Sequence, residues 1–467
     1  MATTTSTFED RANLPSRSEP LVLSQRPLSS MVWELAWPVI VLNLVQTVNT
    51  FVDRKFISAL GTDALAGSGV GMMIVFIMMS LAFALGSATT ALVARFYGAS
   101  DLPTAKQAMN QCVRLAVMLG LLVSVAGFLL LDWLIAVMMG SVGAGAQTAA
   151  RQYLIPTLFA IPAIFVGNVL AGSLRAIGDT RAPMYVMSIM VVIHIAVSWV
   201  LIFGHLGAPR LGLPGASTGF AVSVWVALFL YMPVLRRRVL GGLHLGLIPD
   251  WEWVARIVRI AYPTAIQTSA RTLGMSVFTG ILARTPQAEA ALATLNIGMV
   301  IEGIAFMPGF GYAMAAAALV GQSLGAKVPE KGERLAWIAG AQACAIMTFM
   351  AIPMFVFAEP FARIFTSDPA VLQCTMSYLK IAAISQPPLA FLMVLMMALQ
   401  GAGDTFRAML VAIFAMWVFR VPLTYVWALP LHGGADAAWW SMTIATFLGA
   451  FVAMYVFHRG KWKHVEV

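Results

Sequence analysis

Charged residues are scarce in this chain. Only 10% of its 467 residues are Asp, Glu, Lys or Arg, whereas 60% are hydrophobic. An ordinary soluble domain carries roughly 25% charged residues. The composition therefore excludes a soluble globular fold and indicates that most of the chain lies in a lipid bilayer.

Residues that hold metals or form disulfides are also few. The three cysteines, Cys112, Cys344 and Cys374, show no Cys-x-x-Cys spacing, and the six histidines are scattered along the chain. Paired aspartate-rich motifs for prenyl diphosphates do not occur in the sequence. We therefore expect packing roles for the cysteines, no metal site, no cofactor and no enzymatic activity.

Long apolar runs dominate what remains. Runs of about twenty mostly apolar residues, each long enough to cross a bilayer as a helix, recur along the chain. We predict an all-α, polytopic membrane protein with twelve transmembrane helices in two pseudo-symmetric six-helix bundles. The predicted spans are 31–57, 64–95, 113–133, 152–174, 184–203 and 216–235, followed by 253–282, 291–320, 335–357, 376–399, 408–427 and 437–456.

The two bundles are expected because the sequence repeats itself. Leu174–Thr180 returns as Leu399–Thr405, and Ala36–Pro38 returns as Ala261–Pro263, both 225 positions later. Six spans per half is an even number, so both halves enter the bilayer from the same side, and a site between them is typical of transporters. Further matches at the same or a similar shift pair Tyr153–Leu154 with Tyr378–Leu379, and Gly98–Ala99 with Gly325–Ala326.

These patterns divide the chain into five parts. We expect a disordered cytoplasmic tail over 1–29, an N-terminal lobe over 30–240, a cytoplasmic linker over 241–252, a C-terminal lobe over 253–460 and a second cytoplasmic tail over 461–467. Basic residues gather in the connections on the side of the termini, which by the positive-inside rule places both termini in the cytoplasm. These residues include Lys106, Arg175, Arg181, Arg236, Arg237, Arg238, Lys327, Lys331, Arg334, Arg407, Arg459, Lys461 and Lys463.

The net charge of +9 fits the same interpretation. Basic residues that set topology and contact anionic lipid headgroups account for it, so the expected partner is the lipid bilayer and not a nucleic acid.

The first span carries a polar stripe. At 100° per residue, Asn43, Gln46, Thr50 and Asp53 fall within an arc of roughly 80°, and Asn49 lies beside it. An ionisable group with aligned polar neighbours inside a span indicates a functional site. Two structural alternatives remain open, because amides also join helices together and Asp53 could neutralise a neighbouring basic residue near the membrane surface.

The seventh span repeats this arrangement with a positive charge. Gln267 and Arg271 share one of its sides, and Glu302 on the eighth span lies at similar depth. We therefore expect Arg271 and Glu302 to form an ion pair with a structural role. His194 and Arg420 are the other ionisable groups inside spans that we single out.

Residues along nearly the whole chain resemble the multidrug and toxic compound extrusion (MATE) family. Their order and spacing carry the resemblance, since no single motif decides it. The matching residues are Trp37–Pro38, Val52–Asp53, Leu60–Gly61, Ala64–Ala66, Gly98–Ala99, Leu174–Arg175, Gly178–Asp179, Gly215–Ala216, Gly325–Ala326 and Gly403–Asp404.

The resemblance implies a cation-coupled antiporter of a bacterial-type inner (plasma) membrane that exports amphiphilic, often cationic small molecules by alternating access. Asp53 matches the coupling carboxylate of the family's first helix, and Asn168 resembles a polar residue that faces it. His194 and Ser198 stand where relatives often carry Asn and then Asp or Asn. A lipid-linked precursor flippase of the same two-lobe superfamily is the alternative.

The identity of the coupling ion follows from a departure from the family. Members with a Na⁺ site in the C-terminal lobe carry Glu and Asp where this sequence has Arg271 and Leu389. Because Na⁺ requires several oxygen ligands, the resemblance favours a proton carried by Asp53 over Na⁺.

Overall fold

The structure is a computed structural model that describes residues 20–466, apart from 141–142, 244–245 and 247–248. Every long element in this part of the chain is a helix, which confirms the all-α prediction. The N-terminal lobe contains α1 (Leu28–Ser58), α2 (Thr62–Gly98), α3 (Leu102–Leu129), α4 (Leu131–Met139), α5 (Ala144–Ala176), α6 (Arg181–Phe203) and α7 (Leu213–Arg236).

The second half follows the same order of long and short helices. Short α11 stands between the third and fourth long helices, as α4 does in the first half. This correspondence is what an internal duplication produces. The elements are α8 (Trp251–Leu282), α9 (Ala288–Gly325), α10 (Pro329–Val356), α11 (Ala358–Arg363), α12 (Pro369–Gly401), α13 (Thr405–Ile413), η3 (Phe414–Arg420), α14 (Val421–Ala428) and α15 (Gly434–His458).

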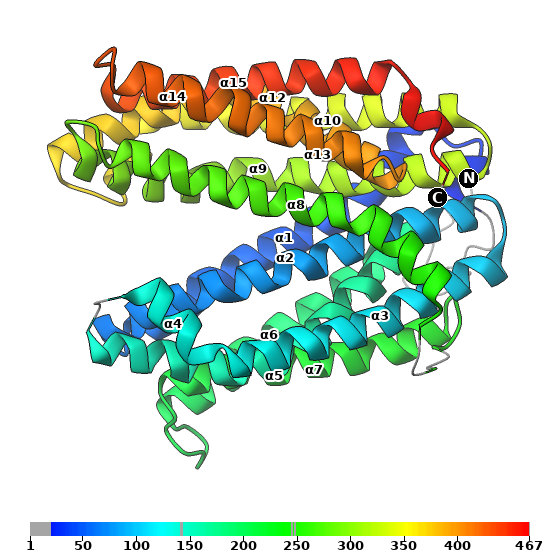
Figure 1. Ribbon diagram of the computed structural model, residues 1–467, viewed down its shortest axis with the longest axis horizontal. Helices are drawn as coiled ribbons and strands as arrows, with labels where there is room; N and C mark the ends of the chain where they lie inside the picture. Colours follow the sequence, from blue (N-terminus) through cyan, green and yellow to red (C-terminus); the bar gives the residue numbers. More distant parts are fainter. Residues whose placement is uncertain (1–19, 141–142, 244–245, 247–248, 467) are drawn as a thin grey trace, which may run out of the picture.

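Eleven helical segments of the described chain are long and apolar enough to cross a membrane. The remaining predicted segment, α8, is long enough but too polar to be counted among them, because it carries three arginines, Arg256, Arg259 and Arg271, together with several polar residues. Its 32 residues nevertheless span about 48 Å and lie alongside the other long helices (Figure 1). A helix this polar is tolerated in a bilayer where its polar side is covered by protein.

Helix boundaries differ from the predicted ones where polar residues begin a helix. The span predicted to begin at residue 113 begins at Leu102, because the Asp101 side chain caps α3 by accepting a hydrogen bond from the backbone N–H of Thr104 at 3.1 Å. The span predicted over 408–427 is interrupted by η3, a π-helical turn just before Pro422. The proline supplies no N–H to the preceding turn, which explains the local widening.

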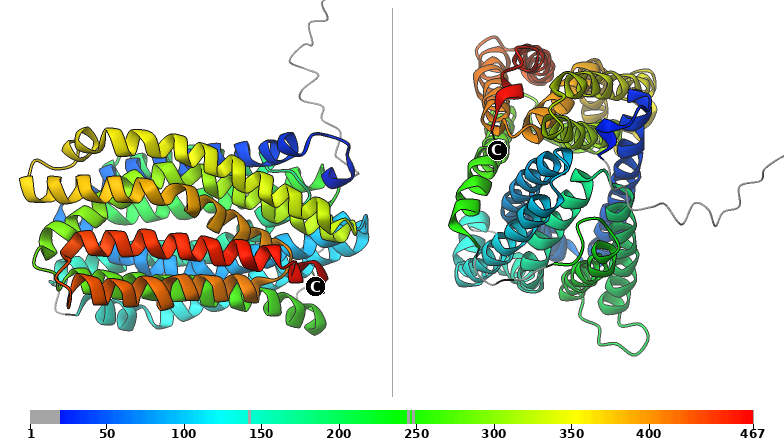
Figure 2. Two further views of the ribbon diagram at one scale, coloured as in Figure 1. Left: turned by 90° about the horizontal axis from the view of Figure 1, so that it is seen from above. Right: turned by 90° about the vertical axis from the view of Figure 1, so that its right-hand side faces the viewer.

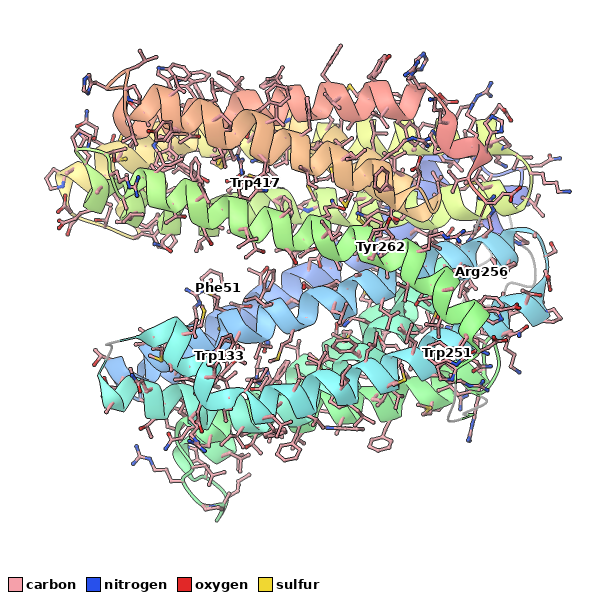
Figure 3. The ribbon with its side chains drawn as sticks, viewed as in Figure 1. Phe51, Trp133, Trp251, Arg256, Tyr262 and Trp417 are labelled. Carbon is pink, nitrogen blue, oxygen red and sulfur yellow. The ribbon has the colours of Figure 1, made fainter. Side chains whose placement is uncertain are left out.

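The two lobes form a V (Figure 1). They meet at the end that carries both termini and diverge toward the opposite end. The right view of Figure 2 looks along the helices from the joined end, with the C-terminal lobe above the N-terminal lobe. Figure 3, which includes side chains, shows the lobes separated at that opposite end, with Phe51 of α1 at the edge of the space between them. The basic connections predicted to be cytoplasmic all lie at the joined end, as the helix order requires.

The first helix of each half joins the two lobes. The beginning of α1, including Leu35, packs in the core of the C-terminal lobe, and the beginning of α8, including Trp253, packs in the core of the N-terminal lobe. Trp33 contacts Tyr312 of α9, whereas Trp253 contacts Phe96 of α2. Figure 3 shows Trp251 and Arg256 at this end of α8 and Tyr262 farther along it.

Glycines allow the lobes to touch at the joined end. A Cβ on Gly98 of α2 would lie 2.1 Å from the backbone oxygen of Gln322 of α9, and a Cβ on Gly325 would lie 1.9 Å from the backbone oxygen of Arg95. These distances are far below any van der Waals contact, so only glycine permits the two backbones to approach this closely. The buried Gln322 side chain adds a hydrogen bond of 2.7 Å to the backbone oxygen of Ala176.

Both terminal segments are more ordered than expected. Residues 1–19 lie outside the described part, but the tail predicted over 1–29 is wrong from Pro20 on, because η2 (Leu21–Leu23) packs Leu21 and Val22 into the core of the C-terminal lobe. At the other end, Trp462 in η4 (Lys461–His464) is fully buried and stacks on Phe457 at 4.8 Å. Residues 461–466 therefore belong to the packed structure.

Candidate functional site

Asp53, Asn49 and His194 meet between α1 and α6. The imidazole Nδ1 of His194 lies 3.0 Å from Oδ1 of Asn49, and its Nε2 lies 3.8 Å from Oδ1 of Asp53. Asp53 is only 8% exposed and His194 only 3% exposed. Asp53 Oδ1 and His194 Nε2 have no hydrogen-bond partner within the described part. A buried carboxylate and a nearby imidazole, both with open bonding positions, form a site where a proton can be held.

Helix α7 packs against α6 at His194 and Ser198. Phe220 contacts the His194 ring edge-on at 5.6 Å, and the Ser198 hydroxyl donates to the backbone oxygen of Ala216 at 3.4 Å. Gly219 lets the helices approach, because a Cβ there would lie 2.3 Å from Ser198 Oγ. Ser198 thus joins α6, the helix that carries His194, to α7.

The other predicted residues of α1 have separate contacts. Asn43 donates through Nδ2 to the backbone oxygen of Met307 at 3.5 Å, which links α1 to α9 of the other lobe. The Thr50 hydroxyl donates to the backbone oxygen of Gln46 at 3.0 Å, a bond inside the helix. The polar stripe therefore combines a helix-joining residue with the site around Asp53.

Asn168 is placed differently from the prediction. Its Nδ2 donates to the backbone oxygen of Ile164 in its own helix at 3.0 Å, and its backbone packs against Gly86 of α2. The structure thus gives Asn168 a contact between α5 and α2 in place of one with Asp53.

A chain of side-chain hydrogen bonds crosses from one lobe to the other. Gln400 of α12 donates through Nε2 to Oε1 of Gln267 at 3.0 Å and accepts at Oε1 from the Ser87 hydroxyl of α2 at 3.1 Å. Gln267 was predicted from its helix face, whereas Ser87 and Gln400 were not. The polar side of α8 is thereby shown to face the contact between the lobes.

The prediction that Arg271 and Glu302 form an ion pair is wrong. The Glu302 carboxylate accepts from the Tyr378 hydroxyl at 2.6 Å and from Gln386 Nε2 at 3.3 Å. Arg271 lies within electrostatic range of Glu302, but no ion pair joins the two side chains in the described structure. Tyr378 and Gln386 reach the carboxylate of Glu302 because α12, which carries both residues, packs directly on α9, which carries Glu302.

The internal repeat could have identified Tyr378 as a site residue from the sequence. Tyr153 and Tyr378 are equivalent in the two halves, and each packs against a glycine of the second long helix of its half, Gly71 of α2 and Gly298 of α9 respectively. Tyr153 also lies within electrostatic range of Asp53, as Tyr378 lies against Glu302. A repeated tyrosine therefore marks the carboxylate in each lobe.

Comparisons with known proteins agree with this architecture. A family model described as MatE matches residues 38–200 and 263–426, one stretch in each half. A probable multidrug resistance protein NorM of Thermotoga maritima is 28% identical over 434 residues, which cover 92% of each chain. An FAD transporter of Shewanella oneidensis is 24% identical over 378 residues, covering 80% of this chain and 82% of its own.

A solved structure has the same fold. It is the outward-facing conformation of a multidrug resistance MATE family transporter, and it matches with a TM-score of 0.88 at 22% identity, covering 96% of this chain and 98% of that chain. At this level of identity the likeness concerns the arrangement of the helices and not the chemistry of the site.

Proposed function

Because this chain belongs to the MatE family of efflux transporters, we propose that it exports amphiphilic, often cationic compounds in exchange for protons that enter through Asp53. The observation that carries this proposal is the buried pair of Asp53 and His194, 3.8 Å apart and without other partners for the facing atoms in the described part of the chain. A site that binds either a proton or a cationic compound couples the movements of the two.

The proposed cycle uses electrostatic attraction. An ionised Asp53 attracts a cationic amphiphile from the side of the termini, which we assign to the cytoplasm on the basis of the basic connections at that end. After the lobes rock to the arrangement seen here, a proton from the opposite side neutralises Asp53 and removes the attraction, so the compound leaves. His194 receives or passes on this proton because its Nε2 faces the carboxylate.

The position of Asp53 suits entry of a proton from the diverging end of the lobes. At 1.5 Å per residue, Asp53 lies about 8 Å from the end of α1, and His194 about 14 Å from the end of α6. Both helix ends belong to the side where the lobes are apart (Figure 1).

Transport in proteoliposomes under separate ion gradients tests this function. We expect ethidium transport to be driven by a pH gradient in Na⁺-free buffer, and a Na⁺ gradient at equal pH to drive none. Vesicles without protein and vesicles with dissipated gradients serve as controls. Transport that follows the Na⁺ gradient and ignores the pH gradient would show that the proposed coupling ion is wrong.

A further inference from the structure

The C-terminal lobe carries reversed charge at the place that corresponds to Asp53 and His194. The repeat shift of 225 residues puts Phe278 at the position of Asp53. The same shift puts Phe419 at the position of His194, and Arg420 is the next residue along the chain. The fold brings this basic side chain to the equivalent of Asp53, since the guanidinium of Arg420 lies 5.9 Å from the centre of the Phe278 ring.

Two guanidinium groups share one carboxylate in this region. Arg420 contacts the Phe278 ring and the sulfur of Met416, and Arg271 is exposed. Both lie within electrostatic range of Glu302, whose oxygens already accept hydrogen bonds from two neutral side chains. Because an unbalanced positive charge within a membrane span is costly, an anionic group at this cluster would be favoured.

Arg271 lies on the side of α8 that faces the other lobe. It follows Gln267 by four residues and therefore projects from the same face of the helix. Gln267 is bonded to Gln400, which in turn is bonded to Ser87 of the N-terminal lobe. Arg271 lies about 16 Å and Arg420 about 12 Å from the ends of their helices at the side where the lobes diverge.

We propose that Arg271 and Arg420 bind the anionic group, a carboxylate or a phosphate, of a transported compound. The planar guanidinium presents paired donors that match both groups. Glu302, held by Tyr378 and Gln386, keeps the two arginines in place by attraction. This inference rests on the proposed export function and adds to its substrates compounds that carry an anionic group, zwitterions included.

Paired probes that differ only in the anionic group test the proposal. We would measure binding to the purified protein in phosphatidylcholine nanodiscs for norfloxacin and its methyl ester, and for riboflavin 5′-phosphate and riboflavin. We expect Arg271→Gln and Arg420→Gln to weaken binding of the two anionic probes about 10- to 100-fold, the usual range for a lost charge-assisted hydrogen bond. Binding of the ester and of riboflavin should stay unchanged, which also shows that the variants are folded.

Arg259→Gln is the matched control, because Arg259 is an exposed arginine on the same helix near its other end. It should bind all four probes as the wild type does. A separate experiment measures norfloxacin binding in nanodiscs that contain phosphatidylglycerol. If this lipid competes with norfloxacin in the wild type, a lipid phosphate occupies the arginines and the assignment to a transported compound is overturned.

The remaining outcomes separate this inference from the function on which it rests. If the wild type binds the probes and Arg271→Gln and Arg420→Gln weaken binding of each probe with an anionic group and of its partner without that group equally, or weaken binding of none, the anion site is wrong and the export function stands. If the wild type binds none of them and transports no ethidium under either gradient, the proposed function itself is wrong.

Discussion

Asp53→Asn is expected to lose proton-driven efflux completely, to the level of vesicles without protein, while inserting into the membrane normally. Asparagine keeps the size and a carbonyl oxygen of aspartate but cannot ionise, so it neither attracts a cationic compound nor exchanges it for a proton. The variant can be checked by ethidium efflux under a pH gradient, with the amount of inserted protein measured in the same vesicles.

Asp63→Asn is the matched control for this variant. Asp63 is an exposed carboxylate in the first turn of α2 and lies at the same end of the molecule as Asp53. Its substitution removes the same charge without touching the Asp53–His194 pair, and we expect efflux within about twofold of the wild type, as for ordinary surface changes. Undiminished efflux by Asp53→Asn would remove this carboxylate from the mechanism.

Gly98→Ala and Gly325→Ala are expected to slow the transport cycle by disfavouring contact between the lobes at the end that carries the termini. Each added methyl would lie about 2 Å from a backbone oxygen of the other lobe. Overpacking of this kind costs about 1–3 kcal/mol, which disfavours the closed arrangement about 5- to 150-fold relative to the opposite state. We expect a proportional fall in the efflux rate.

Pulsed electron spin resonance measures this shift directly. Spin labels at exposed Gln107 and Glu330, in a background without cysteine, report the separation of α3 and α10 near the joined end. Longer distances are expected in both variants. Gly69→Ala on α2 and Gly303→Ala on α9 are controls on the helices that carry Gly98 and Gly325, because a Cβ at either position meets nothing within 4 Å. Unchanged distances in Gly98→Ala and Gly325→Ala would contradict a role for this contact in closing the lobes.

The sequence predicted the helices well because each feature that defines them is local or repeated. Apolar runs placed the spans, and the shift of 225 residues predicted two equivalent bundles. The boundaries failed where a polar residue such as Asp101 caps a helix before the apolar run begins. The π-helical turn at Phe414–Arg420 was also missed, since a single extra residue leaves the hydropathy unchanged.

The site was predicted in part. Asp53 and Asn49 share one helix, so periodicity brought them together, whereas His194 was singled out as an ionisable group inside a span and the resemblance to the family supplied Ser198. The partners of Glu302 could not be found in this way, because Tyr378 and Gln386 lie 76 and 84 residues farther along the chain. Periodicity reports on the face of one helix and not on which helix packs against it.

Proton release on substrate binding is the measurement that tests the central claim most directly. Purified protein in weakly buffered, Na⁺-free solution, with a pH-sensitive dye, is mixed with ethidium below neutral pH. The account predicts that the wild type releases protons on binding, up to one for each compound bound, as binding linked to one titrating group requires, that Asp53→Asn releases none, and that added Na⁺ changes neither result. Release of the same number of protons by Asp53→Asn, or no release by a wild type that binds ethidium, would contradict it.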